Sequence, residues 1–199
     1  MRFIFRAWRR FMATRTPNEQ LIMRIVIGPN ALALNAVGIL QEKLSLYDGS
    51  LKGVNLKGAK LHNAKLARAD LQDVNMQEAN LSNSYLGLTN LKNADLSNAK
   101  LCDANMRETI LPDADLSAAD LSGAHMAAAN LRGAKLHDAN LQNTNLWRTC
   151  FCAADLSDSD FTGAKFSMTE FDTDTILPDG SHWTPETDMT RFCNDEKIN

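Results

Sequence analysis

The sequence has few of the residues on which enzymes and disulfide-stabilised secreted domains depend. Its 199 residues include only four cysteines, four histidines, five prolines and two tyrosines. No apolar run approaches the roughly 20 residues that a transmembrane helix needs. The first residues also lack the uninterrupted apolar segment of a secretory signal. We therefore expect no membrane span, no secretory leader and no disulfide framework.

Motifs for catalysis and for cofactor binding are missing too. There is no glycine-rich phosphate loop and no nucleophile elbow, and the histidines are scattered. Cys150 and Cys152 lie close in sequence, but two thiols without a second pair or a nearby histidine make a poor zinc site. The sequence thus predicts no enzyme, no cofactor and no metal site. Cys102, Cys150 and Cys152 are expected to be incidental surface thiols in a reducing compartment.

What the sequence has in abundance is a five-residue period. Every fifth residue from Leu46 to Ile176 is leucine, methionine, phenylalanine or isoleucine, and two residues before it, from Val54 to Thr169, stands only Ala, Val, Ser or Thr. Helix faces repeat every 3.6 residues and strand faces every 2, so neither explains this period. A unit that turns a corner every five residues does. Four units then make one coil, with the small and the large residue inside and neighbouring coils about 4.8 Å apart.

Typical units read Ala69-Asp70-Leu71 and Ala139-Asn140-Leu141. They resemble the A(D/N)LXX motif of the pentapeptide repeat family over about two thirds of the chain. The resemblance implies an all-β solenoid, a right-handed quadrilateral β-helix, here with an N-terminal α-helical cap. We accordingly divide the chain into an amphipathic basic helix (1–17), a helical cap (18–45), the β-helix (46–177) and a C-terminal turn with a polar tail (178–199).

Both ends of the repeat carry signals for structures that would cover the unpaired backbone groups of a terminal coil. Residues 29–46 have apolar residues at helical spacing, following a Gly-Pro break. After the repeat, residues 177–180 read Leu-Pro-Asp-Gly, which predicts a turn. Trp183 is expected to lie across the last coil, and residues 185–199 are expected to form a mobile tail.

Charge is divided unevenly along the chain, whose net charge is −3. Residues 1–45 carry seven basic and two acidic residues, residues 46–176 carry 12 basic and 17 acidic residues, and the remainder carries two basic and five acidic residues. The protein is thus predicted to be a basic head on a mildly acidic rod. Because the basic residues form only a small positively charged region on an acidic rod, nucleic acid is a poor candidate for the partner.

The first 12 residues of the basic head have the pattern of an interfacial helix. At 100° per residue, one sector is basic and the other is apolar. The basic sector holds Arg2, Arg6, Arg9 and Arg10, and the apolar sector includes Phe3, Ile4, Trp8 and Phe11. Such a helix suits an anionic membrane surface, a protein groove or oligomer contact, the protein's own cap, or an organelle transit peptide. The expected location is therefore cytoplasmic, either free or peripheral to a membrane.

One face of the expected rod differs from the other three, which carry mainly Asn, Asp, Lys, Ser and Gln. This face is built on Leu66, Leu86, Met106, Met126, Leu146 and Phe166. Its outward residues include Ala127 and the six that we take as candidate partner-binding residues: Tyr85, Leu88, Arg107, Trp147, Arg148 and Met168. Exposed aromatic residues flanked by arginine are typical of binding hot spots. The alternative is that the N-terminal helix or the tail folds back over this face.

Together these features predict a non-catalytic scaffold or adaptor for an unidentified protein partner. Two alternatives remain. The resemblance implies that the chain could instead mimic DNA and bind a type II topoisomerase, although lysines and arginines interrupt its acidic columns. It could also be an accessory or assembly subunit of a larger complex, or form an oligomer.

Overall fold

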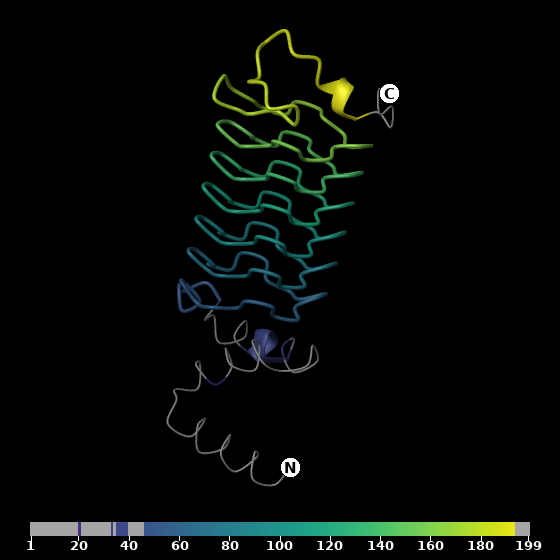
Figure 1. Cartoon of the computed structure of the whole chain (residues 1–199). Coiled ribbons are helices and arrows are strands. Elements are labelled where there is room, and N and C mark those ends of the chain that lie inside the picture. Colours follow the sequence, from purple (N-terminus) through teal and green to yellow (C-terminus); the bar gives the residue numbers. More distant parts are fainter. Residues whose placement is uncertain (1–19, 21–32, 34, 40–45, 194–199) are drawn as a thin grey trace.

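The structure is a computed structural model, and it describes residues 20, 33, 35–39 and 46–193. Residues 46–193 form a rod of stacked coils (Figure 1). The predicted basic helix at 1–17 and most of the predicted cap at 18–45 lie outside the described residues. Residues 33 and 35–39 are helical, and Ala33, Ala36 and Val37 are buried in the same apolar core as Leu46. In the described part of the chain, no helix is both long enough and apolar enough to span a membrane.

Each five-residue unit consists of a bridge residue, an inward core residue and a tight turn. Around Leu61, for example, Lys60 bridges to the next coil and the Ala64 N–H donates to the Leu61 carbonyl at 3.0 Å. Asn63, inside this turn, has a positive φ of 63°. The same position has positive φ in every unit from Gly53 to Met168. Asparagine and aspartate tolerate this left-handed region better than other side chains, so the turn explains their frequency in the repeat.

Neighbouring coils are joined by a parallel ladder that advances 20 residues at a time. Single-residue bridges run from Asn55↔Asn75 to Cys150↔Glu170. The core residues also donate to the next coil, as Leu61 N–H does to the Asn80 carbonyl at 2.7 Å. The β-structure of the described residues consists of these isolated bridges, because a turn interrupts the chain every five residues. Four units per coil give the cross-section four sides, as the period predicts.

The core consists of the two predicted inward columns. All the large repeat residues from Leu46 to Phe161 and all the small ones from Ala59 to Ala164 are buried. Aromatic residues fill the C-terminal end. Phe151 stacks on Phe171, with ring centroids 5.8 Å apart, and meets Phe161 edge-on at 6.1 Å. Phenylalanine rings therefore cluster in the last coils.

The period slips by one residue in the last coil, so the prediction that Ile176 is an inward residue is wrong. Asp155 bridges to Ile176, and it is Leu177 that is fully buried. The preceding turn accommodates the extra residue. There the Thr175 N–H donates to the Asp172 carbonyl at 3.0 Å, and Thr175 Oγ1 donates to the Phe151 carbonyl at 3.0 Å.

The predicted turn at residues 177–180 is confirmed. The Gly180 N–H donates to the Leu177 carbonyl at 2.9 Å, and Gly180 has a φ of 77°. Trp183 lies across the last coil as predicted, because its ring stacks on Phe171 with centroids 6.1 Å apart. The C-terminal end of the rod is therefore covered by an aromatic side chain.

The prediction of a mobile tail from residue 185 is wrong as far as Cys193. Residues Met189–Phe192 form the 3-10 helix η1, which lies at the C-terminal end of the rod (Figure 1). Asp188 caps this helix by accepting the Thr190 N–H at 2.9 Å. Phe192 packs against the core, and the Gly163 N–H donates to the Cys193 carbonyl at 2.9 Å. The segment therefore docks on the last coils, while residues 194–199 lie outside the described residues.

Candidate protein-binding site

Large apolar side chains are exposed along one edge of the rod, which we call the apolar edge. In the described part of the chain, it comprises Tyr47, Tyr85, Leu88, Ile110, Trp147 and Met168. Their exposed fractions run from 39% for Tyr47 to 69% for Met168. In the register of the coils, these positions lie at one corner or on the two sides that meet there. The edge therefore crosses several coils instead of following one loop.

The turns of the apolar edge hold unusual residues for their backbone conformation. Leu88 and Met168 have φ values of 61° and 57°. Of the 19 described non-glycine residues with positive φ, these two alone are large and apolar. Asparagine or aspartate would fit this backbone with less strain. The requirements of the turn therefore do not explain the two apolar side chains.

A column of threonine hydroxyls fixes the backbone of this edge. Threonines replace alanine at the small inward position after four of its turns, and each donates to the carbonyl of a core residue one coil below. The bonds run from Thr89 to Leu66, Thr109 to Leu86, Thr149 to Met126 and Thr169 to Leu146, at 2.8 to 2.9 Å. These bonds tie successive turns together, so the exposed side chains project from a rigid support.

The six candidate residues predicted from the sequence are all exposed, namely Tyr85, Leu88, Arg107, Trp147, Arg148 and Met168. Arg148 lies over the Trp147 ring, with its guanidinium carbon 5.3 Å from the ring centroid. That these residues bind a partner stays a prediction. Ala127, predicted to face outward, is only 7% exposed, because the larger Arg107 and Trp147 occupy the same position in the adjacent coils. Ile110 was missed, although it directly follows one of these turns.

A second group of side chains brings two thiols and a carboxylate together. The thiol sulfurs of Cys150 and Cys152 and a carboxylate oxygen of Glu170 all lie within 4.8 Å of one another. Cys152 is 9% exposed, so the prediction of an incidental surface thiol is wrong for this residue. Burial, with a smaller contribution from Cys150, raises the pKa of Cys152 to about 12. Glu170 was overlooked, although it stands one coil beyond Cys150 in the ladder.

A third group, formed by His137, Asp138 and Asp158, is fully on the surface. His137 Nε2 is 3.0 Å from Asp138, and Nδ1 is 3.5 Å from Asp158 and 3.0 Å from Ser157 Oγ. Both ring nitrogens thus have hydrogen-bonding neighbours. We interpret the group as exposed ion pairing, which contributes little to stability.

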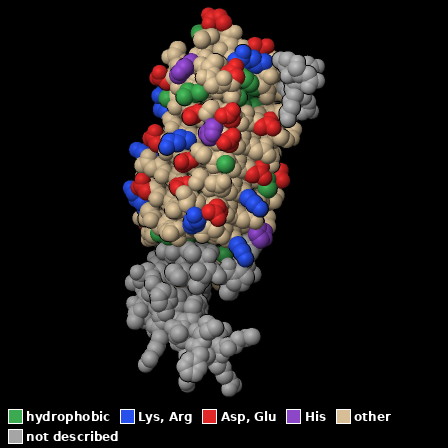
Figure 2. Space-filling model, viewed as in Figure 1, with side chains coloured by type: hydrophobic (Ala, Val, Ile, Leu, Met, Phe, Trp, Pro, Cys, Tyr) green, Lys and Arg blue, Asp and Glu red, His purple; other side chains and the backbone are tan. Residues whose placement is uncertain are grey.

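Charges of both signs are mixed along the rod. Acidic and basic side chains alternate over the face seen in Figure 2. Ion pairs link neighbouring coils, as Lys57 does with Glu78 at 3.1 Å. This face therefore does not carry the continuous acidic columns that a mimic of duplex DNA would need.

Comparison with protein families finds one match. The model for pentapeptide repeats matches with eight copies, over residues 50–87, 89–127, 109–148 and 129–167. No catalytic family is indicated by this match. Comparison with curated protein sequences finds no match.

Solved structures of pentapeptide repeat proteins are similar to this chain. Rfr23 from the cyanobacterium Cyanothece 51142 is 26% identical, with a TM-score of 0.34, over 69% of this chain and 99% of its own. QnrB1, a plasmid-mediated fluoroquinolone resistance protein, is 20% identical, with a TM-score of 0.40, over 72% of this chain and 78% of its own. HetL from Nostoc sp. strain PCC 7120, involved in heterocyst differentiation regulation, is 22% identical, with a TM-score of 0.28, over 73% of this chain and 98% of its own.

Proposed function

This chain belongs to the pentapeptide repeat family, and from that premise we propose that it is a non-catalytic scaffold whose apolar edge binds a protein partner. The observation that carries this proposal is the gathering of all the exposed large apolar side chains of the described residues along one edge. Exposed large apolar side chains that gather on one part of a surface are typical of interaction sites. The edge also has the aromatic and arginine composition of hot spots, with Trp147 beneath Arg148.

The geometry of the edge suits a partner that lies along the rod. Tyr85 and Trp147 are separated by several coils, and the backbone ladder, with the hydroxyl bonds of Thr109 and Thr149, holds the turns between them in a fixed arrangement. A rigid surface loses little conformational entropy on binding, which favours affinity. We therefore expect an extended apolar or amphipathic segment of the partner to contact several coils at once.

Replacing Trp147 by alanine should weaken partner binding by at least about fivefold, which corresponds to about 1 kcal/mol. The partner would be captured by crosslinking and affinity purification from the source cells, and its affinity then measured with the purified pair. His137→Ala is the matched control. It removes an exposed ring ten residues earlier, on the diagonally opposite corner, and should leave binding unchanged.

The same variant tests whether the chain covers its own edge. Trp147 is exposed, so Trp147→Ala should leave the melting temperature of the isolated protein nearly unchanged. A loss of stability of about 2 kcal/mol or more would mean that the ring packs against another part of the chain. If a stable Trp147→Ala variant binds the partner with unchanged affinity, the apolar edge is not the binding interface.

The basic head supports a further proposal, that the scaffold is held at an anionic membrane surface. It rests on the sequence of residues 1–12, which separates arginines from apolar residues at helical spacing. The full chain should sediment with anionic vesicles at low salt and be released as salt rises, because ions screen the attraction. A chain beginning at Asn18 should stay in the supernatant, and equal sedimentation of both would exclude this anchor.

A further inference from the structure

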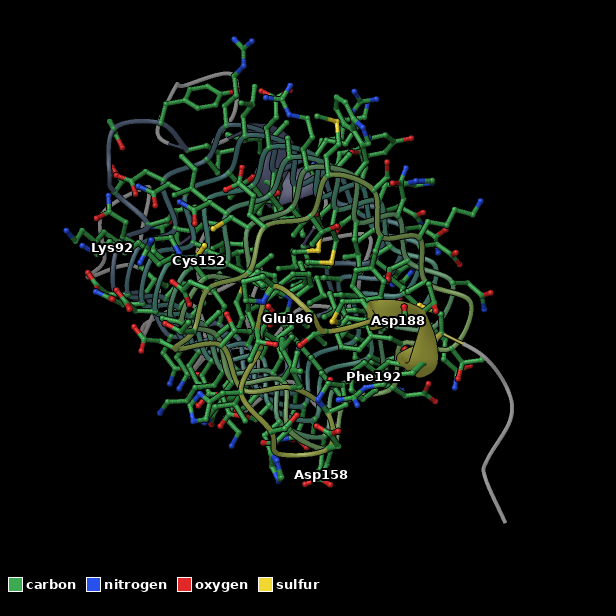
Figure 3. The ribbon with its side chains drawn as sticks, turned by 90° about the horizontal axis from the view of Figure 1, so that it is seen from above. Lys92, Cys152, Asp158, Glu186, Asp188 and Phe192 are labelled. Atoms are coloured by element: carbon green, nitrogen blue, oxygen red, sulfur yellow. The ribbon has the colours of Figure 1, made fainter. Side chains whose placement is uncertain are left out.

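Cys150, Cys152 and Glu170 come together because of the register of the coils. Cys150 and Glu170 are paired in the ladder, one coil apart, so their side chains project from the same side of the rod. Phe151, between the two cysteines, points into the core. Cys152 follows at the corner, where Figure 3, looking along the rod, also shows Lys92 from a lower coil. One five-residue unit thus supplies two thiols, from its bridge residue and its turn, and the next coil supplies a carboxylate.

The backbone that carries these three side chains is held on every side. The Cys150 N–H donates to the Ala129 carbonyl at 3.0 Å, and the Glu170 N–H donates to the Thr149 carbonyl at 2.9 Å. Phe151, which lies between the two cysteines, stacks on Phe171, which follows Glu170 and packs against the core. Side chains held on such a rigid backbone lose little conformational entropy when they bind a metal.

We propose that Cys150, Cys152 and Glu170 bind a thiophilic divalent cation, Zn²⁺, as three of its four ligands. Zinc takes sulfur at about 2.3 Å and carboxylate oxygen at about 2.0 to 2.2 Å in a tetrahedron. Neighbouring ligand atoms of such a site are about 3.3 to 3.8 Å apart, which lies within the 4.8 Å limit that all three atoms satisfy. Glu170 is exposed, so water can occupy the fourth position. Two sulfur ligands favour zinc over magnesium or calcium.

The charged neighbours of the site do not oppose this assignment. Arg132, one coil below Cys152, is 3.9 Å from a carboxylate oxygen of Asp172, so its charge is partly compensated. The other oxygen of Asp172 accepts the Ala153 N–H at 2.7 Å. Asp172 is thereby committed to the turn and to Arg132, and the ligand set remains two thiolates and one carboxylate.

The test is zinc titration of the full chain under reducing conditions, with Co²⁺ as a spectroscopic probe of thiolate ligation. We expect one ion per chain and a cobalt–thiolate charge-transfer band. Loss of an outer-shell partner costs a metal site about 10- to 100-fold in affinity, and loss of a direct ligand should cost at least as much. Cys150→Ser and Cys152→Ser should therefore each weaken zinc binding at least about 100-fold, and Glu170→Gln at least about 10-fold. Cys102→Ser is the control, because this thiol bonds to Ser82 Oγ in another column, and it should leave zinc affinity unchanged.

Several results would overturn the site. Absence of stoichiometric zinc binding by the reduced protein would do so, as would zinc affinity that survives Cys152→Ser. Unchanged affinity in Glu170→Gln would reduce the site to an ordinary pair of thiols. Since Glu170 is exposed, this variant should fold normally, which far-ultraviolet dichroism would verify. Equal competition by Mg²⁺ would contradict thiolate ligation.

Discussion

Replacing Leu116 by aspartate is expected to abolish folding. Leu116 is completely buried in the inward column, between Leu96 and Leu136 of the adjacent coils. The substitution removes about 1.5 to 3 kcal/mol of apolar burial and places a carboxyl group among apolar side chains, which costs several kcal/mol more. The sum is comparable to the entire stability of a typical domain, about 5 to 15 kcal/mol. Leu96→Asp should behave in the same way.

The effect of Leu116→Asp is measured by circular dichroism and thermal unfolding, with Ala118→Asp as its control. Ala118 is two residues away, exposed, and has a φ of 55°. Asp73 and Asp103 occupy the same turn position in other units, so Ala118→Asp should fold with unchanged or slightly higher stability. A soluble Leu116→Asp variant that unfolds cooperatively would show that the assignment of the inward column is wrong.

Replacing Phe151 by alanine should destabilise the protein by about 3 to 5 kcal/mol. The Phe151 ring is fully buried and contacts both Phe161 and Phe171. Its removal would leave a cavity between two coils and also remove the support of the Phe171 ring, on which Trp183 stacks. Urea unfolding would measure the loss as a lower midpoint.

The position of the damage distinguishes this prediction from a general loss of stability. In a stack of repeats, each coil contacts only its neighbours. Hydrogen exchange should therefore accelerate first in the last coils, while amides near Leu61 stay protected. Phe151→Leu restores the residue type of the column and should retain most of the stability. An unchanged urea midpoint in Phe151→Ala would contradict the proposed role of the aromatic cluster.

The five-residue period was sufficient to predict the inward columns and the four-sided coil, because each unit repeats the same local chemistry. It failed at Ile176, where the next residue, Leu177, is also apolar. Sequence alone could not choose between them. The choice depends on the longer turn that Asp172 and Thr175 stabilise. The docking of Met189–Phe192 was not predicted either, because Phe192, which packs against the core, stands within the largely polar stretch 185–199.

The exposure of the candidate residues was predicted correctly where it follows directly from the register, as for Tyr85 and Trp147. It was mispredicted where exposure depends on the size of side chains one coil away, as for Ala127. The thiol group shows the same limitation. Cys150 and Cys152 are visible as a pair in the sequence, whereas Glu170 joins them only when residues one coil apart are compared.

The constant step of the ladder restricts how such a protein can change in length. Removing four consecutive units shortens the rod by one coil and leaves every later residue on its original side. Removing a single unit turns everything beyond it by a quarter revolution. Trp147 and Met168 would then be carried away from the side that Tyr85 and Leu88 occupy. The rod can therefore gain or lose whole coils and keep its apolar edge aligned. Gain or loss of one, two or three units would instead place the two parts of that edge on different sides of the rod.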